Sequence, residues 1–218
     1  ELVRILPNKV NTLQPLAQSR SLTRLEISEN PITDLSPIAE NKGLRILQLN
    51  GTDVENIDCF SEFPELVKVD LVNTKVRDLS PMKDLGNIKS LKVTNSELKD
   101  LSPLENFTKL KSLSLAGCSV AGNEDFATAL EPISKLEIET LDLSGTKLGD
   151  LSPLANLTKL EILKLDNSSA VDITPLSNLK SLKSLTTWDS GISAEAVAEL
   201  KSQIPGLLVI TEEPRYSR

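Results

Sequence analysis

The sequence predicts an α/β solenoid with a parallel β-sheet on its concave face and short 3-10 or α-helical segments on its convex face. The first observation is a five-residue string, Asp-Leu-Ser-Pro followed by an aliphatic residue, which recurs mostly at spacings of 22 residues or a multiple of 22. The second is a Leu-x-x-Leu-x-Leu frame upstream of each string. A unit of this length buries its apolar side only by stacking on its neighbours, so the repeats predict a solenoid.

The repeat register follows from these two patterns. The string occurs at Asp34–Ile38, Asp78–Met82, Asp100–Leu104 and Asp150–Leu154, with a variant at Asp172–Leu176. The frames begin at Leu22, Leu44, Leu66, Ile88, Leu110, Ile138, Leu160 and Leu182, and a last partial frame begins at Leu207. We therefore predict a single domain over residues 1–218, with eight whole repeats between partial repeats at 1–21 and 207–218.

Each frame predicts one short β-strand. In the frame that begins at Leu110, Leu113 and Leu115 alternate with serines, as in a strand with one buried face. Three residues after the last leucine of a frame comes a small polar side chain, which we expect to hydrogen-bond the backbone where the chain turns inward. These residues are Asn30, Thr52, Thr74, Ser96, Cys118, Thr146, Ser168 and Ser190.

The Asp-Leu-Ser-Pro strings predict short helical turns on the convex face. The serine or threonine of each string is a suitable N-cap, and the proline that follows suits the first helical position, where its missing N–H costs nothing. The predicted caps are Ser36, Ser80, Ser102, Ser152 and Thr174. Because the aspartates of the strings recur with the repeat, they indicate backbone capping and not acid-base catalysis.

Two longer repeats predict true α-helices. The first spans 28 residues, and Asn123 followed by Phe126, Leu130 and Ile133 is typical of a capped amphipathic helix. The second spans 25 residues, with Ser193 as its cap and Val197, Leu200 and Ile204 as its buried stripe.

Composition excludes several functional classes. The chain has no histidine, the commonest general base and metal ligand. A net charge of −7 and an aromatic content of 3% argue against a nucleic-acid partner and against an anionic membrane surface. No apolar run is long enough to span a membrane. We therefore expect no enzymatic activity, no cofactor, no bound metal and no membrane insertion.

The two cysteines predict neither a disulfide framework nor a zinc site. Cys59 and Cys118 lie three repeats apart, which is about 14 Å at one strand spacing per repeat, and a disulfide does not span that distance. We expect both to be free, buried thiols, which favours a reducing compartment such as the cytoplasm.

At these residues the chain resembles the leucine-rich-repeat superfamily. The repeat Leu-x-x-Leu-x-Leu-x-x-(Asn/Thr)-x-(Ile/Leu)-x-Asp-Leu-Ser-Pro-Leu-x-x-Leu is similar to the 22-residue class of bacterial internalins and of the leucine-rich regulatory subunits of protein phosphatases, and the internalin form in particular. The resemblance covers residues 1–210. It implies a non-catalytic horseshoe that binds a protein, often secreted or on a bacterial cell surface.

Strand alternation predicts the candidate binding surface. Residues two, four and six places after each frame start should project from the concave face of the sheet, opposite the core. Charged residues with a few apolar ones in these columns form the predicted partner-binding set. The set comprises Arg24, Glu26, Ile46, Gln48, Lys68, Asp70, Val72, Lys92, Asp142, Ile162, Lys164, Asp166 and Trp188.

Some interpretations stay open at this point. Asp70 and Lys92 are neighbours in one column, as are Asp142 and Lys164, so such charges could simply pair between adjacent repeats. Trp188 could be an interface residue, but we favour packing under the tail Pro214–Tyr216 as part of an end cap. The alternative to a protein-binding module is a trimmed recognition or scaffold domain of a larger enzyme or of a surface adhesin. We expect a monomer, with a dimer through the first strand's edge as the alternative.

Overall fold

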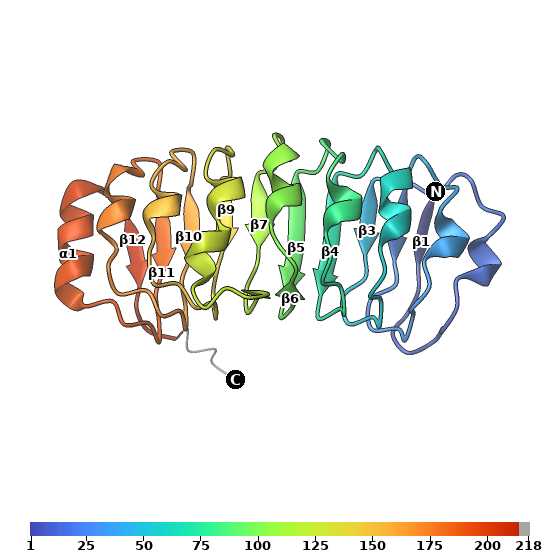
Figure 1. Ribbon diagram of the computed structural model, residues 1–218, viewed down its shortest axis with the longest axis horizontal. Coiled ribbons are helices and arrows are strands. Elements are labelled where there is room, and N and C mark those ends of the chain that lie inside the picture. Colours follow the sequence, from blue (N-terminus) through green and yellow to red (C-terminus); the bar gives the residue numbers. More distant parts are fainter. Residues whose placement is uncertain (214–218) are drawn as a thin grey trace.

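The computed structural model describes residues 1–213 as a solenoid built around a ten-stranded parallel sheet, which confirms the predicted fold class (Figure 1). The strands follow one another across this sheet in chain order. They are β1 (Leu2–Arg4), β2 (Arg24–Glu26), β3 (Ile46–Gln48), β4 (Lys68–Val72), β5 (Ser90–Thr94), β7 (Ser112–Ser114), β9 (Thr140–Asp142), β10 (Ile162–Lys164), β11 (Ser184–Thr186) and β12 (Leu208–Ile210). A separate two-stranded sheet pairs β6 (Glu97–Leu98) with β8 (Ser119–Val120).

The strand register keeps equivalent repeat positions side by side. Leu25 of β2 lies between Val3 and Leu47 of the neighbouring strands, 22 residues away in each direction. At the C-terminal end Val209 lies beside Leu185, one residue earlier than the frame starting at Leu207 predicts. Columns defined in the sequence are therefore rows across the sheet, with that one shift at its end.

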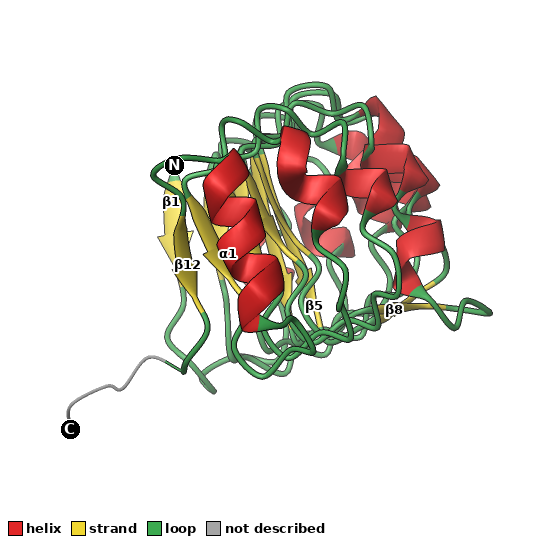
Figure 2. Cartoon of the chain, turned by 90° about the vertical axis from the view of Figure 1, so that its left-hand side faces the viewer, coloured by secondary structure: helices red, strands yellow, loops and turns green. Residues whose placement is uncertain are grey.

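Helical segments cover the side of the sheet opposite to the concave face, as Figure 2 shows in a view along the solenoid. Most of them are single 3-10 turns. They are η1 (Gln14–Leu16), η2 (Ser36–Ile38), η3 (Asp58–Glu62), η4 (Ser80–Met82), η5 (Ser102–Asn106), η6 (Phe126–Ala129), η7 (Glu131–Ile133), η8 (Ser152–Leu154) and η9 (Thr174–Asn178). The α-helix α1 (Ala194–Gln203) lies near the C-terminal end.

The core fills the space between the sheet and these turns. Leu25, Leu47, Val69, Leu91 and Leu113, from the middle of five successive strands, are at most 1% exposed. Burying one such side chain stabilises the fold by about 1.5–3 kcal/mol. Because each leucine packs on its equivalents in the next repeats, the core is continuous along the solenoid.

The predicted serine caps of the convex turns are wrong, and aspartate takes their role. Asp34 Oδ1 accepts a hydrogen bond from the backbone N–H of Ser36 at 2.8 Å, while the residue that precedes η2 is Leu35, which has no acceptor. Aspartate makes the same contact at the start of η4, η5, η8 and η9. The serine is itself the first residue of each turn and the proline the second.

The predicted α-helix after Asn123 is also wrong. The segment forms two successive 3-10 turns, η6 and η7, and the cap is Asp125, whose Oδ1 accepts from the N–H of Ala127 at 2.9 Å. Pro132 explains the break, because it has no N–H to donate and its ring clashes with the preceding turn of an α-helix. The apolar stripe was identified correctly, since Phe126, Leu130 and Ile133 are all buried.

The second predicted helix is confirmed as α1. Ser193 Oγ accepts a hydrogen bond from the N–H of Ala196 at 3.2 Å, which satisfies one of the free amides of the first turn. Leu200 and Ile204 are each 3% exposed, and Val197 is half-buried against the core. The helix packs against η9.

Most of the small polar residues that follow the strands bond the backbone as predicted, but in two ways, whereas the prediction is wrong for Ser168, whose buried hydroxyl has no partner in the described residues. Asn30 connects repeats, because its Oδ1 accepts from the amides of Lys9 and Val10, each at 3.0 Å. Thr52 and Thr146 instead donate to the carbonyl three residues earlier in their own repeat, at 2.6 Å. The threonines close their own turns and leave the contact between repeats to the backbone and the core.

Candidate functional site

The candidate site is the concave face of the sheet, where the predicted columns lie side by side. Strand pairing brings Arg24, Ile46 and Lys68 into one row, and Glu26, Gln48 and Asp70 into the next. The second half of the sheet continues these rows with Ile162, which is 37% exposed, and with Lys164. Val72, Asp166 and Trp188 lie at or beyond the far ends of their strands. The candidate residues thus share one face and extend over most of the sheet.

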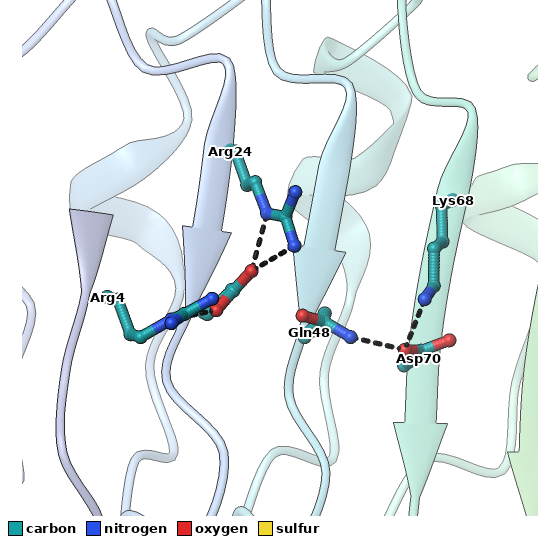
Figure 3. Close-up of polar contacts among 6 residues, drawn as sticks. Arg4, Arg24, Gln48, Lys68 and Asp70 are labelled. Atoms are coloured by element: carbon teal, nitrogen blue, oxygen red, sulfur yellow. Dashed lines mark hydrogen bonds and ion pairs between the residues drawn. The ribbon is translucent and has the colours of Figure 1, made fainter. Parts of the chain in front are cut away.

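Glu26 is the buried centre of a charge cluster in the first half of this face, which strands β1 to β5 form. Its side chain is only 11% exposed and forms ion pairs with Arg4 of β1 and Arg24 of its own strand. Figure 3 labels the two arginines, which lie on neighbouring strands. The hydrogen bond from Arg4 holds the pKa of Glu26 below its usual value, and burial opposes that shift.

Asp70 is the second carboxylate of this half, and it is 3% exposed. Its Oδ2 accepts from Gln48 Nε2 at 2.7 Å and pairs with Lys68 Nζ at 3.3 Å (Figure 3). Its Oδ1 is buried with no hydrogen-bond partner among residues 1–213. Lys92, the neighbour in the same row, is exposed and takes part in no ion pair within the described residues, so Asp70 pairs with the other neighbouring cation.

Carboxylates of the second half of the face bind mainly backbone amides and hydroxyl groups. Asp166 accepts from the hydroxyl of Thr186 at 2.6 Å and from the N–H of Trp188 at 3.1 Å. Asp142 accepts from the N–H of Ser144 at 3.1 Å and pairs with Lys164 at 3.6 Å. The inter-repeat charge pairing that the sequence suggested therefore occurs at Asp142 and Lys164.

Trp188 is half-buried at the end of β11. Its backbone joins two repeats, because its N–H donates to Asp166 and its carbonyl accepts from the N–H of Asn167 at 2.8 Å. The tail Pro214–Tyr216, under which we expected the indole to pack, lies outside the described residues.

Strand alternation missed two cations on this face. Arg45 and Lys89 stand one place after their frame starts, just before β3 and β5, and both side chains are exposed. They line a hollow of about 630 Å³ with Arg24, Ile46 and Lys68 from the predicted set. The signal that could have found them is the recurrence of a cation at this position, since Lys111 occupies it as well.

Neither cysteine is activated as a nucleophile. Both are free, with Cys118 buried and Cys59 half-buried. Burial raises the pKa of the Cys59 thiol to about 12 and that of Cys118 to about 11. Both groups therefore remain protonated thiols at neutral pH. Since the thiolate is the reactive form, neither cysteine is a good nucleophile.

The described residues contain neither a candidate metal site nor a helix that could span a membrane. Within residues 1–213, no three acidic or sulfur-bearing side chains cluster so that they could hold a metal ion. In the same part of the chain, no helix is long and apolar enough to cross a membrane.

Solved structures with the same architecture identify the repeat class. Internalin C2 of Listeria monocytogenes superimposes with a TM-score of 0.78 and 28% sequence identity, over 85% of this chain and 80% of that chain. Internalin F of the same organism gives a TM-score of 0.65 at 26% identity, over 93% of this chain and 71% of that chain. The protein is an internalin-like leucine-rich-repeat solenoid. No protein-family model and no curated protein matches the sequence.

A plant leucine-rich-repeat ectodomain shares the same fold. It belongs to the membrane receptor kinase GASSHO1/SCHENGEN3 of Arabidopsis thaliana, whose structure was solved in complex with CASPARIAN STRIP INTEGRITY FACTOR 2. The TM-score is 0.74 at 18% identity, over 93% of this chain and 25% of that chain. At this identity the likeness concerns the fold alone.

Proposed function

We propose that the protein is a non-catalytic binding module that recognises a protein partner on the concave face of its sheet. The observation that carries this proposal is that no described helix covers this face, although the opposite face is fully packed (Figure 2). Exposed Ile162 and unpaired Lys92 lie on it. A broad face with apolar points among charges suits a protein surface better than a small substrate.

The comparisons support a macromolecular partner. The plant ectodomain with this fold was solved in complex with CASPARIAN STRIP INTEGRITY FACTOR 2, and the plant peptide hormone receptor RGFR1 was solved in complex with RGF2. We further propose that residues 1–218 form one domain of eight whole repeats between two partial ones. The likeness to internalins favours a secreted or surface location.

Affinity capture from the native source tests the proposal with three forms of the chain. The concave variant carries Lys92→Glu with Lys164→Glu. The matched control carries Lys83→Glu with Lys135→Glu, which makes the same charge change at exposed positions next to η4 and η7. Thermal unfolding first establishes that all three are folded.

We expect the same protein to be retained by the wild type and by the control, and to be lost with the concave variant. Retention by both variants would refute a contact through Lys92 and Lys164, and would move the site to the convex helices, the Trp188 end, the edge of β1 or a part of the sheet away from these two lysines. Loss from the control alone would refute it as well, because the convex lysines would then carry the contact.

A further inference from the structure

The hollow at the start of strands β2 to β5 has an unusual lining. Its walls are almost wholly apolar, although four of its eight lining residues, Arg24, Arg45, Lys68 and Lys89, are cationic. The aliphatic stems of these side chains therefore face the hollow, while the charged ends of Arg45 and Lys89 extend to its rim toward water. Ile46 and Val67 complete the apolar floor.

Two parallel rows across the strands create this arrangement. In the outer row, the N–H of Val67 donates to the carbonyl of Arg45, and the N–H of Lys89 donates to the carbonyl of Val67, each at 2.8 Å. In the inner row, Ile46 lies between Arg24 and Lys68. Each row thus reads cation, aliphatic residue, cation, and the inner row is displaced by one strand.

The two rows differ in how their charges are used. Arg24 and Lys68 are paired with the buried carboxylates of Glu26 and Asp70. Arg45 and Lys89 are exposed and make no ion pair within residues 1–213. The hollow is therefore a site of unneutralised positive charge on a chain whose net charge is −7.

We propose that this hollow binds an acidic segment of a partner protein in which an aliphatic side chain lies between two carboxylates. The carboxylates would pair with Arg45 and Lys89, and the aliphatic side chain would cover Ile46 and Val67. This inference rests on the proposed function and specifies the chemistry of the partner.

The spacing of the rim charges defines the segment further. Arg45 and Lys89 precede strands that are two positions apart in the sheet, which is about 10 Å at the usual strand spacing. Residues three apart in a polyproline-II segment lie on the same side, about 9.3 Å from each other. A Glu-Leu-Pro-Glu motif therefore places both carboxylates opposite the two cations.

A nucleic acid fits the hollow less well. None of the eight lining residues is aromatic, so unstacked bases would find no platform there. The negative net charge also opposes a long polyanion.

The test measures binding of fluorescein-labelled peptides by fluorescence polarisation. The probe is Gly-Gly-Glu-Leu-Pro-Glu-Gly-Gly. Its matched peptides replace both glutamates by lysine, or the leucine by serine, and a ten-residue oligothymidylate serves as the nucleic-acid probe. The protein forms are the wild type, Arg45→Glu with Lys89→Glu, the concave pair Lys92→Glu with Lys164→Glu, and the convex pair Lys83→Glu with Lys135→Glu.

We expect the probe to bind the wild type at least tenfold more tightly than the lysine peptide and at least threefold more tightly than the serine peptide. The Arg45/Lys89 variant should lose at least tenfold in affinity, the convex variant should bind as the wild type does, and added salt should weaken binding.

Three results would overturn the inference. The first is equal affinity for the glutamate and lysine peptides. The second is binding of the oligothymidylate through Arg45 and Lys89 as tightly as the glutamate peptide, since negative charge alone would then be sufficient for binding. The third is probe binding that survives the Arg45/Lys89 changes but not the Lys92/Lys164 changes. That last result would leave the concave binding face intact and reject only the hollow. Failure of the capture experiment with a positive peptide result would instead reject the role of Lys92 and Lys164 and leave the hollow intact.

Discussion

The two halves of the concave face use equivalent carboxylates in different ways. Asp70 and Asp142 stand at the same place in their repeats, yet Asp70 binds two side chains, while Asp142 binds a backbone amide and one lysine. In the first half acidic groups neutralise neighbouring side chains, and in the second half they order the ends of the strands. The position in the repeat fixes where a carboxylate lies, and its neighbours decide what it does.

Asn50 and Asp166 also share a repeat position, six places after their frame starts. Asn50 Oδ1 accepts from the N–H of Val72 at 3.0 Å, and Asp166 Oδ1 accepts from the equivalent N–H of Trp188 at 3.1 Å. The contact needs only an oxygen acceptor, so an amide in one half replaces a carboxylate in the other. The charge of Asp166 is not required for it.

The largest expected effect is that of Asp166→Ala, which removes the acceptor from a partly buried backbone amide. Leaving such a donor unsatisfied costs about 1–3 kcal/mol. Asp166→Asn, which copies Asn50, should cost less than about 1 kcal/mol, because the acceptor remains. Urea unfolding of both variants checks this. Equal losses of stability for the two variants would show that the negative charge of Asp166, and not its acceptor oxygen, stabilises this end of the strand.

A smaller effect is expected from Asp70→Ala in the first half. Gln48 and Lys68 are both half-buried and can bond water once the carboxylate is gone, so the loss of stability should stay within about 1 kcal/mol. Removal of Asp70 also eliminates a buried oxygen that has no partner in the described residues. Urea unfolding of Asp70→Ala in parallel with Asp166→Ala tests this prediction. A larger loss of stability for Asp70→Ala would reverse the proposed difference between the two halves of the face.

The contribution of Glu26 should depend on pH. Its pKa is lowered in the folded state, so its stabilising effect is present above the unfolded pKa of about 4.3 and disappears as the pH falls through the lower folded pKa. The stability difference between the wild type and Glu26→Gln should therefore be constant near neutral pH and shrink in acid. A difference that stays constant down to pH 2 would show that packing and not charge holds this cluster.

The smallest effect should be that of Lys164→Ala. Its ion pair with Asp142 is 3.6 Å long and the lysine side chain is 45% exposed, so the pair contributes at most about 0.2–1 kcal/mol. High salt should abolish the difference from the wild type. A loss that persists at 1 M salt would indicate that the aliphatic stem of the lysine, and not its charge, stabilises the sheet.

The fold was predictable because every repeat contains the same leucine frame. Local exceptions to the repeat were not predictable. A single residue, Pro132, converts an expected α-helix into η6 and η7, although the burial of Phe126 and Leu130 follows the sequence pattern. The aspartates of the convex turns cap the backbone, as the sequence predicts, but the serine two residues after each is the first residue of the turn and not its cap.

The candidate site was predictable only in outline. Alternation along each strand placed Arg24 and Lys68 on the concave face, but it could not place Arg45 and Lys89, which precede the strands and do not obey the two-residue period. Which cations stay free depends on ion pairs such as those of Arg24 with Glu26 and of Lys68 with Asp70. These contacts depend on side-chain conformations that no repeat pattern encodes.

The 22-residue offset between neighbouring strands from β1 to β7 has an evolutionary consequence. Loss of one repeat unit, such as residues 66–87, would leave the stacking of the remaining repeats intact but would bring Arg45 directly beside Lys89 and remove Val67 from between them. Unequal recombination between repeats could in this way rewrite the order of chemical groups on the concave face in a single event. In such an array, new specificity arises by deleting or duplicating rows, without the gradual redesign of a core.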